Sequence, residues 1–572
     1  MARRKRTSAS QNKTRPKEPE EKQVRASNLR AYLPLAILLI IVLVGTFFRV
    51  YHLNYPVIGY HNWKETHYIT EARNFAEHGF FTHGFFVPYS DLPFLRSDES
   101  GAHPDTFPTI SIIVGIAFKI LGPSLAIARI INMLLGIGAI IAMYFFMKKL
   151  FKREDIALLC AFLVAINPLF IYFSHNVQLD NTGLFFMLLS LIFYLEWIEK
   201  NDTRNAMYTA LALALGILTK YSFAIFIIPM LFIFPWKRLK EIRTRWKTYL
   251  FSALILFLIP VWIVYSNIIL PKTLNVPIEG NLIYANLSAA FSADTWTALK
   301  IYALDNYGGI GNFQLGIVLA TLGLIVFLLM LRKQGMKTSN KFLLGYILGL
   351  IPWFIVMAEK LAGHSYHQYP IAPLIIMLIA YLFVIISVNV ESLIGKAHLR
   401  YIPLVIFALL LLPSSITAKD RVFDRQFIGL DVAGEYIKAH SQPTETIFHS
   451  SNQNYGVLWN ADRKGYRPPA TVEDLMWGEE NRNVRWIFMY QWGISQYMSN
   501  SEVAGYISEN YALRQVGLMQ QGAQFTPIYL LLEKGGTTNF SDLNGYLQNK
   551  QPQTREYETT KGKTQMTYID VD

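Results

Sequence analysis

The sequence predicts an α-helical protein that crosses a membrane about eleven times and ends in a small α/β domain outside the cytoplasm. Of its 572 residues, 52% are hydrophobic and only 16% are charged, whereas a soluble domain carries about 25% charged residues. The hydrophobic residues form long apolar runs up to about residue 417, and the chain then becomes polar again. A single cysteine, Cys160, excludes both a disulfide scaffold and a cysteine-based zinc site.

The first 30 residues are strongly basic. They contain ten Lys or Arg and three acidic residues, with no apolar periodicity. We expect residues 1–30 to form a disordered cytoplasmic tail. A cleaved signal peptide is not expected, because the tail is long and ends in no small-residue cleavage site.

Eleven apolar runs follow the tail. They cover residues 31–48, 125–146, 156–174, 182–198, 206–219, 222–235, 249–270, 314–331, 342–358, 370–388 and 401–417. Several are shorter than the roughly 20 residues that span a bilayer. The pair 206–219 and 222–235 is the weakest, since reading both as one span would place the basic segment 236–248 outside the cell.

A shorter run, 109–121, decides the predicted topology. If it crossed the membrane, the basic loop at 147–155 would face outward. If it is re-entrant or interfacial, five loops share the side of the basic tail and together hold 18 basic and six acidic residues: 147–155, 199–205, 236–248, 332–341 and 391–400. The positive-inside rule favours the second arrangement. Residues 31–417 then form the transmembrane domain, with the N-terminus cytoplasmic.

Three outer segments follow from this topology: 49–107, 271–313 and 418–572. The last is expected to be a soluble α/β domain, with strands at 446–450, 485–490 and 528–533 and helices at 431–440, 502–510 and 542–548. It shows neither a glycine-rich phosphate loop nor a metal cluster. The net charge of +13 is thus a charge asymmetry across a membrane, and it does not indicate nucleic-acid binding.

Three carboxylates are candidates for catalysis at the outer surface. Glu65 lies in the segment 62–78, which has apolar residues at helical spacing and is expected to lie along the membrane surface. Asp105 precedes the short run, and Asp180 lies at the outer end of a span. If they converge, one could act as a general base while another binds a metal or orients an acceptor. Glu65 and Asp180 could equally be helix-capping residues, Glu65 in a capping box with Asn62.

Basic and aromatic residues on the same side are candidates for substrate binding. Lys220 and Arg129 lie near outer span ends, where each could bind a lipid phosphate or extend to lipid headgroups. The histidine-rich segment 49–107 could hold a metal or could be an ordinary polar interfacial loop. The full set of candidate binding residues is Lys64, His61, His103, Arg129, Lys220, His364, Tyr366, His367 and Tyr369. The loop at 359–370 could bind a sugar-phosphate or form an aromatic belt.

Taken together, these segments resemble the membrane glycosyltransferases of GT-C type. The nearest groups are the dolichyl-phosphate-mannose protein mannosyltransferases and the bacterial lipid A aminoarabinose transferase. The resembling segments are 63–68 (WKETHY), 71–74 (EARN), 103–105 (HPD), 121–124 (LGPS) with Ala128 and Arg129, 167–168 (NP), 178–180 (QLD), 216–221 (GILTKY) and 367–370 (HQYP). The strong part of the resemblance covers about residues 45–235, and it rests on the order of the segments and their shared side.

The resemblance implies a reaction. Such enzymes move a sugar from a polyprenyl-phosphate carrier to a protein, lipid or glycan acceptor on the outer face, with inversion at the anomeric carbon. Their first outer loop carries a pair of adjacent acidic residues. At the matching positions this chain has Lys64 and Glu65, so the second acid is kept and the first is replaced by a cation. Asp105 could replace the missing acid, Asp180 matches the second acidic position, and Lys64 could pair with a phosphate or with Glu65. A divalent metal is compatible with this chemistry but is not required.

Two other functions fit the sequence less well. A transporter or flippase of lipid-linked sugars would explain the number of spans. No inverted repeat is evident, however, and the ionisable residues gather at one face rather than at the midplane. A non-catalytic assembly or receptor protein would act through residues 418–572.

Overall fold

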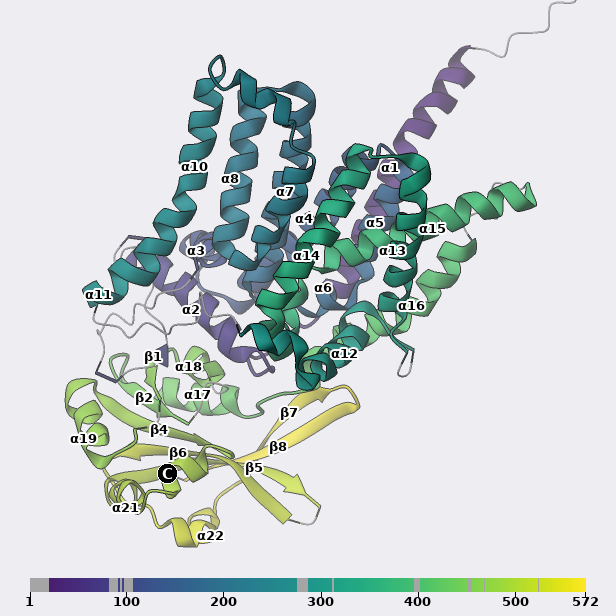
Figure 1. Ribbon diagram of the computed structural model, residues 1–572. Helices are drawn as coiled ribbons and strands as arrows, with labels where there is room; N and C mark the ends of the chain where they lie inside the picture. The colour runs from purple at the N-terminus through teal and green to yellow at the C-terminus, as the bar shows by residue number, and fades with distance from the viewer. Residues whose placement is uncertain are drawn as a thin grey trace, which may run out of the picture.

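The structure is a computed structural model with two parts, a bundle of helices and a C-terminal domain built on a β-sheet (Figure 1). It describes residues 20–81, 91–92, 95–96, 106–274, 286–310, 313–395, 402–450, 455–467, 469–522 and 524–571. The candidate residues His103 and Asp105 lie outside these ranges, as do residues 1–19. Helix α1 (Glu20–Arg49) begins inside the segment predicted to be a disordered tail, so that prediction is wrong for residues 20–30.

Seven helices of the bundle are long and apolar enough to cross a membrane, counted over the described residues. They comprise α1, α4 (Leu125–Phe151), α7 (Leu179–Lys200), α10 (Trp246–Val264) with its continuation η3 (Tyr265–Ile269) and α11 (Leu270–Leu274), α13 (Leu315–Gln334), α14 (Thr338–Gly363) and α15 (Ala372–Ile394). The chain is therefore a multi-pass membrane protein, as predicted.

The four remaining apolar runs are helical as well. They form α5 (Glu154–Ile166) and α6 (Pro168–Tyr172), α8 (Thr203–Thr219), the 3-10 helix η1 (Tyr221–Phe226) with α9 (Ile227–Phe232), and α16 (Ile402–Asp420). Every run predicted to span is thus helical, and the total of eleven spans stays a prediction beyond the seven.

Helix α7 shows how the weak pair of runs is arranged. Lys220, after the end of α8, forms an ion pair with Asp180 at the start of α7. Arg238 in η2 (Trp236–Glu241) donates hydrogen bonds of 3.0 and 2.7 Å to the carbonyls of Trp197 and Ile198 near the end of α7. Residues 221–235 therefore run the length of α7, which agrees with two separate passes for 206–219 and 222–235.

The basic loops gather at the end of the bundle remote from the C-terminal domain. Lys149 and Lys152 after α4 pair with Glu196 and Glu199 at the end of α7. Arg245 donates to the carbonyl of Asn201 in the next loop. Loops 147–155, 199–205 and 236–248 thus share one face, as the charge pattern predicts.

The short run 109–121 forms α3 (Thr109–Leu121) and does not cross the bundle. At its start, Phe107 N donates to Leu218 O (3.0 Å) and Thr219 Oγ1 donates to Thr109 Oγ1 (2.7 Å), both at the end of α8. At its other end, three residues lead into the start of α4. Both ends of α3 therefore lie at the same face of the bundle, which we call the domain face because it meets the C-terminal domain (Figure 1).

Helix α2 (Asn62–His78) lies at the domain face between the bundle and the C-terminal domain (Figure 1). Its apolar residues Ile69, Ala72 and Phe75 are buried against α3, as the helical spacing predicts. Most of its polar side chains are buried too, and its residue Asn62 accepts a hydrogen bond from Gly456 N in the C-terminal domain (3.1 Å). The predicted helix at 62–78 is thus present and enclosed by protein, and its placement along the membrane surface stays a prediction.

The outer segment 271–313 also contributes to the domain face. It contains η4 (Leu287–Phe291) and α12 (Ala293–Tyr307). Asn306 donates to Gln368 (3.2 Å) in η5 (Ser365–Gln368), and Asp305 pairs with Arg421 (2.7 Å) in η7 (Arg421–Phe423). These contacts join α12 to the loop after α14 and to the chain entering the C-terminal domain.

The C-terminal domain is an eight-stranded mixed sheet with helices on both faces. The strand order is β1-β3-β2-β4-β6-β5-β8-β7. The strands are β1 (Asp91–Leu92), β2 (Thr446–His449), β3 (Gly465–Tyr466), β4 (Val484–Tyr490), β5 (Tyr511–Gln521), β6 (Gln524–Lys534), β7 (Gln553–Thr559) and β8 (Gly562–Asp570). The first four strands pair in parallel and the rest are antiparallel.

Helices α17 (Leu430–His440) and α18 (Tyr455–Ala461) cover the sheet face that meets the bundle (Figure 1). The other helices are α19 (Val472–Asn481), α20 (Ile494–Met498), α21 (Ser501–Asn510), η9 (Phe540–Asp542) and α22 (Leu543–Leu547), which pack on the opposite face. All three predicted strands and all three predicted helices are present. Strand β1 comes from the first outer segment, so this sheet includes residues from outside 418–572.

Candidate active site

Asp180 and Lys220 form a buried ion pair at the domain face. Asp180 lies in the first turn of α7, and Lys220 follows the last residue of α8. Helices α7 and α8 pack closely, which places the start of one beside the end of the other. The side chains are only 3% and 10% exposed, and Lys220 Nζ also donates to the carbonyl of Tyr366 (3.3 Å). Gln178 rather than Asp180 is the N-cap of α7 and makes no side-chain cap bond, so the capping alternative for Asp180 is wrong.

The Tyr366 ring joins four basic side chains from distant parts of the chain. Lys64 Nζ lies 3.8 Å and Lys220 Nζ lies 4.7 Å from the ring centroid. His364 stacks on the same ring at 5.1 Å, and His367 lies 4.5 Å away. We call these five residues the Tyr366 cluster. The predicted binding residues Lys64, Lys220, His364, Tyr366 and His367 thus come together, and the His61 ring lies 5.6 Å from Tyr366 at the edge of the cluster.

The histidines of this region are poised in the neutral form. Burial and the nearby charges of Lys64 and Lys220 lower the pKa of His364 to about 4. Burial, Lys64 and His364 lower the pKa of His61 to about 3, and the pKa of His367 lies well below its usual value for similar reasons. The fixed positive charge at neutral pH therefore comes from the two lysines, and Lys220 is paired with Asp180. Such a site attracts an anion, and an anion there would favour protonation of the histidines.

Several buried polar atoms of the domain face find no hydrogen-bond partner within the described part of the chain, and those of Gln178 and Thr182 flank Asp180 in the sequence. They belong to Thr66 and Thr70 of α2, Gln178 and Thr182 around the start of α7, and the Nδ1 atoms of His61 and His367. An unsatisfied buried polar group costs about 1–3 kcal/mol, and native proteins contain few of them. Their concentration beside an ion pair is typical of a site built for a polar ligand.

Glu65 is held by Arg129 rather than by a helix cap. Arg129 Nε and Nη2 donate to the two oxygens of Glu65 at 2.9 and 2.8 Å, and Val177 N donates to Glu65 Oε1 at 3.2 Å. Arg129 Nη1 binds the carbonyls of Leu53 and Tyr55. The N-cap of α2 is His61, without a side-chain cap bond, so the predicted capping box with Asn62 does not form. The pair instead fastens α2 to the segment 53–55 and to the loop before Asp180.

Two predicted binding residues lie apart from the Tyr366 cluster. The guanidinium of Arg129 is occupied by Glu65 and backbone carbonyls, so it is not free for a lipid phosphate or headgroup. Tyr369 is fully buried, and its hydroxyl donates to Asn181 Oδ1 at 2.9 Å. Both residues contact parts of the chain next to the site: Arg129 binds Glu65, and Tyr369 binds Asn181. Among the described residues, no group of three or more His, Cys, Asp or Glu side chains would suit a metal ion.

The residues that hold the loop 173–178 in place were not predicted from the sequence. The buried guanidinium of Arg49, at the end of α1, binds Ser174 Oγ (3.1 Å) and the carbonyls of Ala165 and Val164. Asn132 Nδ2 on α4 binds the carbonyls of Phe173, Ser174 and Asn176. Arg49 directly follows the apolar run 31–48 and Asn132 lies within the run 125–146, where polar side chains are functional candidates by default. That signal could have found them.

Comparison with known proteins agrees with this fold. Residues 102–265, which include α3, Arg129, Asp180 and Lys220, match the family described as dolichyl-phosphate-mannose-protein mannosyltransferase. No curated protein sequence matches the chain significantly.

Two solved structures share the architecture. An oligosaccharyltransferase from Archaeoglobus fulgidus has a TM-score of 0.55 at 14% identity, over 86% of this chain and 73% of its own. ArnT from Cupriavidus metallidurans, bound to undecaprenyl phosphate, has a TM-score of 0.54 at 13% identity, over 88% of this chain and 97% of its own. The chain has the fold of GT-C type membrane glycosyltransferases, and its residues 102–265 match the mannosyltransferase family. The resemblance seen in the sequence is thereby confirmed.

Proposed function

We propose that this chain is a glycosyltransferase that takes a hexosyl or pentosyl group from a polyprenyl-phosphate carrier and passes it to an acceptor hydroxyl. The observation that carries the proposal is the placement of Lys64 and Lys220 at the Tyr366 ring, beside the buried carboxylate of Asp180. Two ammonium groups at one ring suit the phosphate of the donor, because phosphate oxygens pair with cations. The structures with a related fold include ArnT with undecaprenyl phosphate and the archaeal enzyme AglB with a dolichol-phosphate.

An apolar cavity near the cluster suits the lipid of such a donor. It has a volume of about 500 Å³ and lies between η4, α12, α14 and the start of α15. Its lining residues are all apolar or aromatic: Ala290, Phe291, Trp296, Leu350, Ile351, Phe354, Ile355 and Ile371. Helix α14 runs from this cavity to His364, and Ile371 lies five residues beyond Tyr366. A lipid held along α14 would therefore place its phosphate at the Tyr366 cluster, where opposite charges pair.

The reaction follows from the charges of the site. The acceptor oxygen attacks the anomeric carbon of the donor sugar from the side opposite the phosphate, and the bond between that carbon and the phosphate oxygen breaks. The bond electrons leave with the phosphate, whose growing charge is stabilised by Lys64 and Lys220. The acceptor proton passes to Asp180, which becomes available as a base once Lys220 turns from it to the phosphate. The anomeric configuration is inverted.

We assign different roles to the two described carboxylates. Asp180 has one ion-pair partner and lies among polar groups without partners, so it is the catalytic base of the proposal. Glu65 has both oxygens bound by Arg129 and Val177 and acts as a positioning residue for the loop that leads to Asp180. Asp105 lies outside the described residues, and its contribution stays a prediction.

The proposed orientation places the domain face outside the cell. The basic loops at the opposite end would then face the cytoplasm together with the N-terminus. The donor reaches the site from the membrane, and the acceptor is a glycan, a lipid or a protein that reaches it from the outer side.

The test is transfer by the purified full chain supplied with a polyprenyl-phosphate sugar and a crude acceptor fraction. We expect Asp180→Asn to lower kcat by about 10²- to 10⁴-fold, as removal of a general base does. Asp294→Asn is the matched control, because Asp294 is an exposed carboxylate in α12 at the same face. Full transfer by Asp180→Asn would contradict the assigned base. Absence of any donor-dependent product from the unmodified chain would contradict the function itself.

A further inference from the structure

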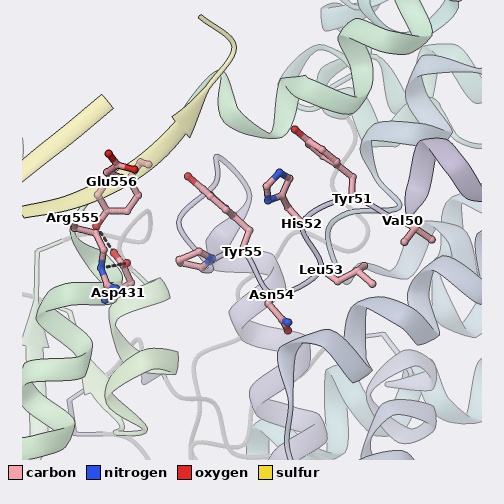
Figure 2. Close-up of a pocket in the computed structure, with 11 residues that line it drawn as sticks. Val50, Tyr51, His52, Leu53, Asn54, Tyr55, Asp431, Arg555 and Glu556 are labelled. Carbon is pink, nitrogen blue, oxygen red and sulfur yellow. Dashed lines mark hydrogen bonds and ion pairs between the residues drawn. The ribbon is translucent and has the colours of Figure 1, made fainter. Parts of the chain in front are cut away.

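A second cavity lies between the bundle and the C-terminal domain (Figure 2). Its volume is about 540 Å³. One wall is formed by residues 50–56, which connect α1 to α2. The other wall is formed by Asp431 of α17 and by Arg555, Glu556 and Tyr557 of β7. The reaction described above gives this cavity no role.

The wall from residues 50–56 is aromatic and rigid. Tyr51, His52 and Tyr55 lie along it (Figure 2). The Tyr51 and His52 rings pack edge to face at 4.1 Å, and Tyr55 packs on Phe423 at 4.9 Å. Lys419 Nζ lies 4.0 Å from the centroid of the Tyr51 ring, which further fixes this ring. Fixed aromatic rings offer flat apolar surfaces without a large entropy cost on binding.

The opposite wall carries polar groups that are also held in place. Tyr557 donates from its hydroxyl to Asp431 Oδ1 at 2.7 Å, and Arg555 Nε lies 3.5 Å from Asp431 Oδ2. Arg555 also pairs with Glu435, and Figure 2 shows Arg555, Asp431 and Glu556 together across from Tyr55. Carboxylate, guanidinium and phenol groups together accept and donate hydrogen bonds.

The two walls are fastened to each other at one end. The Tyr55 hydroxyl donates to Gln426 Oε1 at 2.6 Å and accepts from Glu558 N at 3.1 Å, and Gln426 Nε2 donates to the carbonyl of Glu558. These bonds tie the hairpin of β7 and β8 to the segment 50–56. The cavity is therefore a formed site between two parts of the chain.

A second, much smaller space lies behind the aromatic wall, on the side of Glu65 and Arg129. This enclosed space of about 10 Å³ shares Tyr51, His52, Tyr55 and Pro56 with the large cavity and is also lined by Glu65, Arg129, His175 and Asn176. The last two residues belong to the loop that leads to Asp180. An acceptor bound in the large cavity would thus lie next to the wall that holds the catalytic loop.

We propose that this cavity binds the saccharide part of a glycan acceptor. A cavity with aromatic residues in one wall and mixed hydrogen-bond donors and acceptors in the other suits a sugar, which has apolar CH faces and a rim of hydroxyl groups. Two lining acids against one arginine disfavour an anionic lipid or nucleic acid, and the polar wall disfavours an acyl chain. The inference rests on the proposed function for calling this ligand an acceptor, while saccharide binding itself needs no donor.

The chain offers a direct reporter of occupancy. Its one native cysteine, Cys160, is fully buried, so an added surface cysteine is the site that a hydrophilic maleimide labels. Asn54→Cys places a thiol at an exposed position of the cavity lining (Figure 2). Gln524→Cys, exposed at the start of β6 and outside this lining, is the matched control.

The experiment measures maleimide labelling of both variants in nanodiscs without donor. The probes are an oligosaccharide fraction released by mild acid from the envelope of the cells that make this protein and a peptide fraction from the same envelope. We expect the oligosaccharides to slow labelling of Asn54→Cys about tenfold and to leave Gln524→Cys unchanged. Adding Tyr51→Ala should remove the protection, whereas adding Phe525→Ala, which removes an exposed ring elsewhere in the domain, should preserve it.

Unchanged labelling of Asn54→Cys, or protection by the peptide fraction alone, would overturn the saccharide site. Because the assay contains no donor, this result leaves glycosyl transfer untouched. Conversely, protection by oligosaccharides in a protein that transfers no sugar would uphold the site and contradict the proposed function.

Discussion

Replacing Arg129 with methionine should destabilise the protein strongly, because it leaves Glu65 as an unpaired buried charge. The side chains of the pair are only 7% and 2% exposed, and two hydrogen bonds of 2.9 and 2.8 Å join them. Breaking a buried ion pair by removing one partner costs about 3–5 kcal/mol. The double variant Arg129→Met with Glu65→Gln should recover a large part of this loss, since no uncompensated charge remains.

The assay is unfolding of the full chain in mixed micelles with increasing sodium dodecyl sulfate. Arg204→Met is the control, because Arg204 is an exposed arginine at the start of α8 on the opposite face. Stability and turnover measured together distinguish a positioning role of Glu65 from a catalytic one. Glu65→Gln should lower stability and donor turnover together. A Glu65→Gln protein of unchanged stability that binds donor but transfers no sugar would refute the positioning role and make Glu65 the base.

Three further predictions concern the donor site. Lys64→Gln should weaken binding of undecaprenyl phosphate about tenfold or more, as loss of a charged contact does, with thermal stability as the control; unchanged binding by calorimetry would remove Lys64 from the phosphate site. Burial and the two lysines hold the pKa of His364 at about 4. A bound phosphate should raise that pKa, so the complex should take up a proton when it forms. The affinity for undecaprenyl phosphate should therefore increase about two- to tenfold from pH 7.5 to 5.5. The increase should be smaller in His364→Gln. An affinity that falls over this pH range would be inconsistent with anion binding at the Tyr366 cluster. Trp296→Ala should weaken binding of the full-length lipid phosphate about tenfold and leave binding of inorganic phosphate unchanged. An equal loss of affinity for both ligands would exclude the apolar cavity as the lipid site.

The helices of the bundle were predictable because a membrane imposes a strong pattern on the sequence. Each apolar run is helical, and the positive-inside rule correctly separated α3 from the crossing segments. The rule was decisive because a crossing by this one short run would have moved five basic loops to the other side of the membrane. The C-terminal sheet was harder to predict. Strands β2, β4 and β6 carry buried apolar residues, whereas β7 is largely exposed and polar. Strand β1 joins this sheet from a distant segment.

Many residues of the candidate site could be predicted from the sequence, but the ion pairs among them could not. Sequence position alone placed Glu65, Asp180 and Lys220 at one face. Which cation each carboxylate meets depends on how α2, α4, α7 and α8 pack, and local spacing suggested helix caps instead. The binding loop shows the same limit, since Tyr366 lies between two lysines while Tyr369, three residues later, is buried on Asn181.

The most direct test of the proposed function is a single-turnover transfer assay with a radiolabelled polyprenyl-phosphate sugar and the purified chain. The account predicts labelled acceptor from the unmodified protein, together with release of polyprenyl phosphate. It predicts that Asp180→Asn still binds the donor but forms product at least about 10²-fold more slowly. Product formation by Asp180→Asn at the full rate, or no labelled product from the unmodified protein with any envelope acceptor, would contradict it.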